Sequence, residues 1–206
     1  MKKEQYCTII GDINKSRSLA GRARVQEKFQ HAIETLNKEF KKEIASKFIL
    51  TLGDEFQGLL YSPSESYRLV RRFQDLMGKT SFSFGIGVGT LSTELTATAI
   101  GMDGECFHRA RNALGRAKSN KRDVVYDYDH PTVSLVNALI GLMETQWSRL
   151  TPRQKKISQL MKELRNQEAV AKKLRITQPA VSKVYSTGAI KQLQEAEKAL
   201  HDALMP

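Results

Sequence analysis

Cysteine is scarce in this sequence: Cys7 and Cys106 are the only two among 206 residues. Their positions form no paired spacing of the kind that binds zinc, and so few thiols are typical of a reducing cytoplasm. Long apolar runs are missing too. No stretch of 18 apolar residues occurs, so no membrane span is expected. The charged start, MKKEQ, lacks the apolar stretch that follows in a signal peptide. We therefore expect a cytoplasmic protein that does not associate with membranes.

Acidic residues are few relative to basic ones. The chain has 22 Asp and Glu against 33 Lys and Arg, which gives a formal net charge of +11. This excess favours a polyanionic partner, most commonly nucleic acid, although lysines that only keep the protein soluble are the alternative explanation. The four histidines have no metal-ligand spacing, and Ser16 and Ser18 lack the paired His and Asp of a hydrolytic triad.

Hydrophobic periodicity in the first two thirds of the chain predicts alternating strands and helices. The expected elements are a strand at 6–13, a helix at 19–43, a hairpin at 48–60, a helix that begins at 62–64 with a serine cap and ends at Gly78, a strand at 81–91, a helix at 102–118 and a strand at 124–126. Split βαβ units in this order build a ferredoxin-like sheet covered by helices, so the predicted fold class is α+β. The glycines of GIGVG, in the strand at 81–91, allow close approach of another backbone or a ligand.

Two acidic residues stand where predicted strands end. Asp12 follows the apolar run YCTII and a glycine, and Asp54 lies beside Glu55 at the tip of the hairpin FILTLGDEFQGLL. If these segments are neighbouring strands, Asp12 and Asp54 lie close together and repel unless a cation or a proton intervenes. Hard oxygen ligands on rigid strands suit Mg²⁺ or Mn²⁺, which also take substrate phosphates as ligands. The alternative is that Asp54 only serves the hairpin turn.

These segments resemble the palm-type domain of class III nucleotidyl cyclases and GGDEF-type diguanylate cyclases over about Tyr6–Tyr128. In the cyclases, an Asp-Ile at the end of the first strand and a Gly-Asp in the following hairpin hold two metal ions. Asp12-Ile13 and Gly53-Asp54 match those positions. The resemblance implies that Asp12 and Asp54 bind Mg²⁺ or Mn²⁺. It also implies nucleotide-binding positions at Ile13, Gly53 and Glu55.

The sequence departs from the cyclase pattern at three places. Leu50 stands where purine-selecting cyclases have a Lys, and Leu52 stands where the diguanylate signature has a second Gly. Residues 108–112, HRARN, replace the late-helix pattern Asn-x-Ala-x-Arg, and a shift of one residue turns a side chain by about 100°. The candidate catalytic residues are therefore His108, Arg109 and Arg111. We expect binding of a metal–nucleotide complex, and cyclisation stays open.

The last third of the chain is predicted to be helical. Residues 132–147 have one apolar side and form either a link between domains or a dimerisation helix. A helix over 152–164 begins with a Thr cap and Pro at its first position. The stretch 167–186, QEAVAKKLRITQPAVSKVYS, resembles a helix-turn-helix, with Arg175 in place of the usual turn glycine. The last helix, 189–204, completes the core of this domain or pairs with a second subunit.

A helix-turn-helix places its second helix in the major groove of DNA. Thr177 caps that helix here, and Gln178 at its start suits adenine, while Ala180 suits a thymine methyl group. Basic side chains suit phosphates, which position a protein without reading sequence. The predicted DNA-binding residues are Lys172, Lys173, Arg175, Thr177, Gln178, Ala180, Ser182 and Lys183. A plain helical hairpin with a solvated basic face is the alternative.

The overall plan looks like that of the SatD family of bacterial proteins. We predict a palm-like domain at 1–130, a connecting helix at 131–150 and a helix-turn-helix domain at 151–206. The favoured function is a transcriptional regulator that binds double-stranded DNA, with a weaker expectation of a homodimer. Its first domain would sense a nucleotide with Mg²⁺ or Mn²⁺. The alternatives are a metal-dependent nucleotidyl cyclase or transferase that is targeted to DNA, and a palm-like domain that serves only as a dimerisation scaffold.

Overall fold

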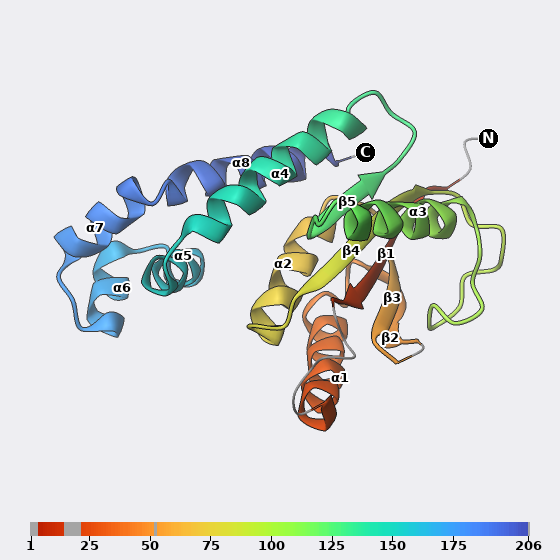
Figure 1. Cartoon of the computed structure of the whole chain (residues 1–206), viewed down its shortest axis with the longest axis horizontal. Coiled ribbons are helices and arrows are strands. Elements are labelled where there is room, and N and C mark those ends of the chain that lie inside the picture. Colours follow the sequence, from red (N-terminus) through yellow and green to blue (C-terminus); the bar gives the residue numbers. More distant parts are fainter. Residues whose placement is uncertain (1–3, 15–21, 52, 206) are drawn as a thin grey trace. The chain divides into compact units, whose positions relative to one another are not determined.

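The computed structural model describes residues 4–14, 22–51 and 53–205. The chain divides into two compact units, each described by itself below: unit 1 is Met1–Asn137 with His201–Pro206, and unit 2 is Ala138–Leu200. Figure 1 labels the elements along the chain. The helices are α1 Arg22–Glu39, α2 Ser66–Met77, α3 Glu105–Ser119, α4 Val133–Arg149, α5 Pro152–Leu164, α6 Gln167–Leu174, α7 Gln178–Thr187 and α8 Ile190–Ala203. No helix within the described ranges combines the length and the apolar character that crossing a lipid bilayer requires.

The described part of unit 1 contains a sheet of five strands in the order β2-β3-β1-β4-β5. The strands are β1 Tyr6–Ile13, β2 Ile44–Leu50, β3 Glu55–Leu60, β4 Phe82–Gly89 and β5 Val124–Asp127. Strand β1 runs antiparallel to both of its neighbours, β3 and β4, and β5 joins the edge of β4 in parallel. The first four strands have the order of a ferredoxin-like fold built from two split βαβ units. The predicted α+β fold class, with a helical C-terminal part, is therefore confirmed.

One face of the sheet packs against α1 and α2 through a cluster of phenylalanines. Phe29 of α1 meets Phe56 of β3, and Phe73 of α2 meets Phe82 of β4, with ring centroids 5.7 and 4.8 Å apart. These four rings are at most 1% exposed. Edge-to-face pairs of this kind add about 0.5–1.5 kcal/mol each beyond the burial of apolar area. Gly11 of β1 leaves room for the cluster, because a Cβ at this position would overlap the Phe56 ring.

The opposite face of the sheet is covered by α3 (Figure 1). Successive residues of a strand point to opposite faces, and Ile10 of β1 packs against Ala110 and Leu114 of α3. Gly85 and Gly87 of β4 face the same helix: a Cβ on Gly85 would lie 2.8 Å from the Leu114 Cα and would overlap the Ala110 carbonyl oxygen. The backbone of α3 therefore makes the close approach that these glycines predict.

Helix α2 begins later than the sequence predicted. The Ser62 hydroxyl accepts a hydrogen bond from the Ser64 backbone N–H at 3.3 Å, which closes a local turn instead of capping a helix. The N-cap position is Glu65, which makes no side-chain cap hydrogen bond, and Gly78 follows the end of the helix as predicted. The predicted start of the first helix near Leu19 lies outside the described residues, as do Ser16, Ser18 and Leu52.

Unit 2 contains a cluster of three short helices, α5, α6 and α7. Their shared core consists of Ile157, Leu160, Val170, Ala171 and Val181. Thr151 forms a capping box with Gln154 at the start of α5, Asn166 caps α6, and Thr177 caps α7. Arg175, between α6 and α7, has a φ of 53°, the left-handed conformation that glycine favours at the end of a helix. The turn of the predicted helix-turn-helix is thus made without glycine.

Candidate functional site

Strands β1 and β3 bring three acidic residues to one end of the sheet. Asp12 is the cross-strand partner of Glu55, and the Ile13 backbone N–H donates to the Asp54 carbonyl oxygen at 3.0 Å. Directly opposed residues of an antiparallel pair share a face, so Asp12 and Glu55 both lie on the face that α3 covers. We call Asp12, Asp54 and Glu55 the acid rim.

Helix α3 supplies counter-charges to the acid rim. The Lys118 ammonium lies 2.7 Å from Asp12 Oδ2, and Arg111 donates to both carboxylate oxygens of Glu55, with Nη2 at 2.9 Å from Oε1. The two cations are seven residues apart, which places them two helical turns apart on one side of α3. The Asp12 side chain is 15% exposed and that of Lys118 45%. The acid is therefore held under the helix while the cation reaches solvent.

Burial dominates the electrostatics of Asp12. Burial raises the pKa of Asp12, the hydrogen bond and charge of Lys118 lower it, and the negative charges of Asp54 and Glu55 raise it again. The hydrogen bond from Arg111 to Glu55 raises the pKa of the Arg111 guanidinium, which stays charged. Three carboxylates against two cations leave an excess of negative charge, which a further cation would relieve.

Replacing Asp12 with asparagine is expected to raise the thermal midpoint at pH 7 by roughly 1–4 °C. The pKa of Asp12 is raised in the folded protein. Because the folded protein binds the Asp12 proton more tightly than the unfolded chain does, protonation of Asp12 stabilises the fold. This contribution to the free energy of unfolding is fully present below the ordinary aspartate pKa, and it is lost as the pH rises through the pKa of Asp12 in the folded protein. The gain in Asp12→Asn should therefore shrink below about pH 4. Asp129→Asn, at an exposed position, is the control in scanning calorimetry. A lower midpoint for Asp12→Asn at pH 7 would mean that the Lys118 pair outweighs burial.

Two of the three catalytic candidates are engaged away from the acid rim. His108 is paired with Asp103 at 3.2 Å, and Arg109 is paired with Glu105 at 2.7 Å. Arg111 is the candidate that contacts the rim, through Glu55. The sequence interpretation did not single out Lys118. Its spacing of seven residues from Arg111 does not distinguish it, because Arg109 and Arg116 on the same helix have the same spacing.

The remaining predicted nucleotide positions flank the acid rim. Ile13 is 7% exposed, so its side chain belongs to the core and its backbone is the part near the rim. Gly53 has a φ of 74°, and its carbonyl oxygen accepts from Gln26 Nε2 at 3.2 Å. Glu55 is held by Arg111 as described above. Gly53 therefore shapes the hairpin turn that carries Asp54.

The carboxylate oxygens of the acid rim are the type of ligand that a divalent cation such as Mg²⁺ prefers. No group of three or more His, Cys, Asp or Glu side chains in the described ranges could by itself hold a metal ion. Asp12 and Asp54 offer two hard carboxylates instead, which is the partial set that Mg²⁺ uses when phosphates and water complete its coordination. The Lys118 ammonium already takes one Asp12 oxygen. A divalent cation at this place would therefore compete with Lys118.

The predicted DNA-binding residues of unit 2 lie on α6, on α7 and in the turn between them. Six of them are exposed, namely Lys172, Lys173, Arg175, Thr177, Gln178 and Lys183. The other two, Ala180 and Ser182, are partly exposed. Gln178 Nε2 donates to Gln167 Oε1 at 2.7 Å, so the first residues of α7 and α6 are joined. The Gln178 amide also has a second N–H and a carbonyl oxygen, the groups that pair with adenine. The contact of Gln167 with Gln178 is one that the sequence interpretation missed.

Comparison with known proteins gives one family match. The model of the SatD family matches residues 6–203, whereas no curated protein matches the chain. A bacterial light-regulated adenylyl cyclase is similar at 11% identity and a TM-score of 0.43, over 59% of this chain and 74% of that chain. The guanylyl cyclase domain of the RhoGC fusion protein from the aquatic fungus Blastocladiella emersonii has 10% identity and a TM-score of 0.41, over 55% and 74%. A regulator of polyketide synthase expression from Bifidobacterium adolescentis has 14% identity and a TM-score of 0.28, over 96% and 80%.

Proposed function

The chain belongs to the SatD family, and we propose that it is a DNA-binding transcriptional regulator whose N-terminal sheet binds a nucleotide with a divalent cation. The observation that supports the proposal is helix α7, which Thr177 caps and which packs in a compact helix cluster with Gln178 and Lys183 exposed. In this proposal residues 1–130 bind the nucleotide, residues 131–150 connect, and residues 151–206 bind DNA.

The distribution of charge supports a polyanionic partner for unit 2. Residues 138–200 contain 12 Lys and Arg against five Asp and Glu, so most of the formal charge of +11 lies in less than a third of the chain. Lysines on α6 and α7 suit phosphates on either side of a groove. Gln178, held by Gln167, suits a base edge. The basic face and the candidate reading residue thus belong to the same pair of helices.

Footprinting or gel-shift experiments with genomic DNA fragments test this part of the proposal. We expect a specific complex whose affinity falls steeply with salt, since each phosphate contact contributes a slope of roughly −0.9 in log K against log salt. Binding no tighter than to a scrambled duplex at moderate salt would remove the DNA-binding function and leave the helical-hairpin alternative.

The cations beside the acid rim support the nucleotide part of the proposal. Lys118 and Arg111 are about half exposed, at 45% and 53%, so their charged groups can reach a phosphate oxygen at the surface. Their carboxylate partners are only 15% and 16% exposed, so a divalent cation would have to replace the charge that a departing Lys118 leaves at Asp12. Asp12 and Asp54 would hold the divalent cation, which would neutralise the phosphates when bound. Four side chains from β1, the β2–β3 turn and α3 would then share one ligand.

A nucleoside triphosphate with Mn²⁺ is expected to raise the thermal midpoint of the protein. A ligand at 100 times its dissociation constant adds about 2.7 kcal/mol, which is roughly 5–10 °C for a chain of this size. Asp54→Ala and Lys118→Ala should lose most of this rise, whereas Lys42→Ala, at an exposed turn position, should keep it. If none of the triphosphates raises the midpoint, the sheet unit is a scaffold and this part of the proposal fails.

The second candidate function is a metal-dependent nucleotidyl cyclase or transferase that is targeted to DNA. The bidentate contact of Arg111 with Glu55 favours it, because a cation next to paired carboxylates is what phosphoryl transfer needs. Incubation with each triphosphate and Mn²⁺, followed by mass spectrometry, separates the two candidates. A product that disappears in Asp12→Ala and Asp54→Ala would favour the enzyme. A bound but unaltered triphosphate would favour the sensor.

A further inference from the structure

Helix α4 has two apolar stripes where the sequence predicted one apolar side. The buried stripe is Val136, Ile140 and Met143, at 0–3% exposure. The second stripe is Leu135, Leu139 and Leu142. Each of these residues directly precedes a residue of the buried stripe, so both stripes have spacings of four and then three residues. Leu135 and Leu142 are 68% and 71% exposed. Leucines at this spacing form the seam that one helix presents to another, so the outer stripe suits a helical partner.

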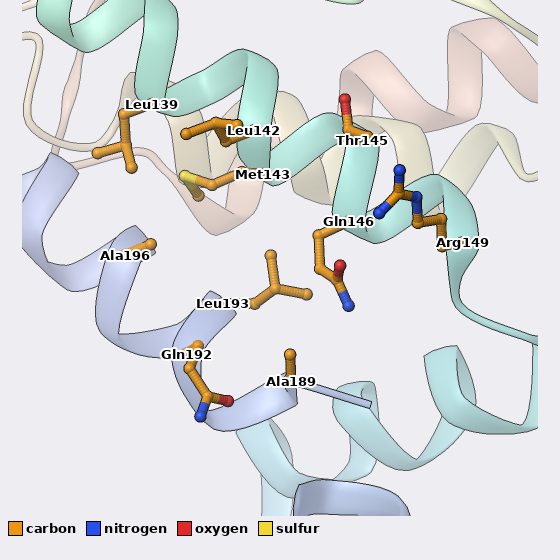
Figure 2. A pocket seen from close by; sticks show the side chains of 10 residues that line it. All are labelled: Leu139, Leu142, Met143, Thr145, Gln146, Arg149, Ala189, Gln192, Leu193 and Ala196. Atoms are coloured by element: carbon orange, nitrogen blue, oxygen red, sulfur yellow. The ribbon is translucent and has the colours of Figure 1, made fainter. Parts of the chain in front are cut away.

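The outer stripe borders an apolar groove within unit 2. Leu139 and Leu142 of α4 and Leu193 and Ala196 of α8 line the groove, whose volume is about 430 Å³. Figure 2 shows these side chains directed from the two helices toward the space between them, with the polar groups of Arg149 at one end. Side chains of a packed helix enter grooves of this kind.

Charge indicates which partner fits this surface. The charged residues of α4 are Glu144 and, at its last position, Arg149. Every other helix of the described chain carries a Lys or Arg before its last residue. Nucleic acid and acidic lipid surfaces need clustered cations, and Arg149 is the single cationic residue of the described chain that lines the groove. A second copy of this chain carries a formal charge of +11 and is repelled by cationic faces, but α4 lets it approach.

We propose that Leu139 and Leu142 of the outer stripe and the α4–α8 groove, all within unit 2, form the interface of a homodimer. The surface carries both a leucine ridge and a groove, so two copies related by a two-fold axis can each place leucines in the groove of the other. The inference goes beyond the proposed function, because the dimer forms without DNA or nucleotide. It would place two copies of α7 in one particle, as readers of paired half-sites require.

Light scattering coupled to size-exclusion chromatography tests the dimer on the full chain without DNA. We expect the wild type at micromolar concentration to have twice the monomer mass of 23.3 kDa. Leu142→Lys adds a charge to an exposed position of the stripe and should raise the dimer dissociation constant at least 100-fold. Ile100→Lys is the matched control, because Ile100 is 68% exposed outside α4 and α8. Circular dichroism checks that each variant is folded.

A second variant tests the groove separately from the ridge. Ala196→Phe fills the groove with the chain's own side chain and should also favour the monomer, at least tenfold. The proposal is overturned if the wild type has the monomer mass, if folded Leu142→Lys and Ala196→Phe both stay dimeric, or if Ile100→Lys dissociates the dimer equally.

Discussion

Alanine in place of both Lys172 and Lys183 is expected to weaken binding to duplex DNA about 100-fold at moderate salt. The two lysines are exposed, one on α6 and the other on α7. A hydrogen bond to a charged group contributes on the order of 1.5 kcal/mol, which is slightly more than a factor of ten in affinity. Because each lysine that leaves a phosphate also lowers the number of released counterions, the salt slope should fall by about two. Fluorescence anisotropy titrations at several salt concentrations measure both quantities.

The control for this prediction has the same net charge. Lys41→Ala with Lys42→Ala, in an exposed turn of unit 1, also removes two positive charges and should leave the dissociation constant within about twofold. Equal weakening in both double variants would mean that DNA responds to total charge and not to the α6–α7 face. If the double variant at Lys172 and Lys183 binds DNA with wild-type affinity, the DNA-binding surface does not include these lysines and lies elsewhere on the protein.

The sheet could be predicted from the sequence because its determinants are local and repeated. Phe82, Phe84 and Ile86 alternate with small residues along β4, and the structure buries all three. The start of α5 could also be predicted from the sequence, because Thr151 is a typical N-cap residue and Pro152 directly after it is typical of the first helical position. Once the order of elements is known, the rules of chain connection leave few topologies.

The counter-charges of the acid rim could not be predicted in the same way. The chain has 33 Lys and Arg, and which of them reach Asp12 and Glu55 depends on how α3 is rotated on the sheet. The contacts of Gly85 and Gly87 with the α3 backbone fix that rotation. A rotation by one residue, about 100°, would turn Arg111 and Lys118 away. Tertiary packing determines these pairs, and no local pattern encodes it.

The structure differs from the sequence predictions at α4 and at the start of α2, and both differences have local causes. The two stripes of α4 are offset by a single residue, so helical periodicity alone places Leu139 with Ile140 and Leu142 with Met143 on one apolar side. At the start of α2, Ser62 has the composition of a cap, but its hydroxyl satisfies the Ser64 N–H. Hydroxyl side chains compete with the helix for backbone groups in just such positions.

Gly85→Ala is expected to lower the free energy of unfolding by about 3 kcal/mol, the upper part of the range for overpacked cores. The added methyl group would overlap the Ala110 carbonyl oxygen and the Leu114 backbone N. Because those atoms belong to a hydrogen-bonded helix, they cannot rotate away as a side chain could. Helix α3 must then move off the sheet, which removes its contacts with Ile10. Urea denaturation followed by circular dichroism measures the loss.

Gly115→Ala is the matched control on the same helix. It adds the same methyl group to α3 at a position where a Cβ would meet no heavy atom within 4 Å beyond the adjoining backbone of its own helix, and alanine in a helix interior should stabilise by about 0.5–1 kcal/mol. Opposite signs for the two substitutions would show that β4 needs glycine for packing and not for chain flexibility. The same displacement of α3 would carry Lys118 and Arg111 away from Asp12 and Glu55, so Gly85→Ala should also lose the nucleotide-dependent rise in midpoint. If Gly85→Ala is as stable as the wild type, α3 is not seated on β4, and the ion pairs of the acid rim lose their structural basis.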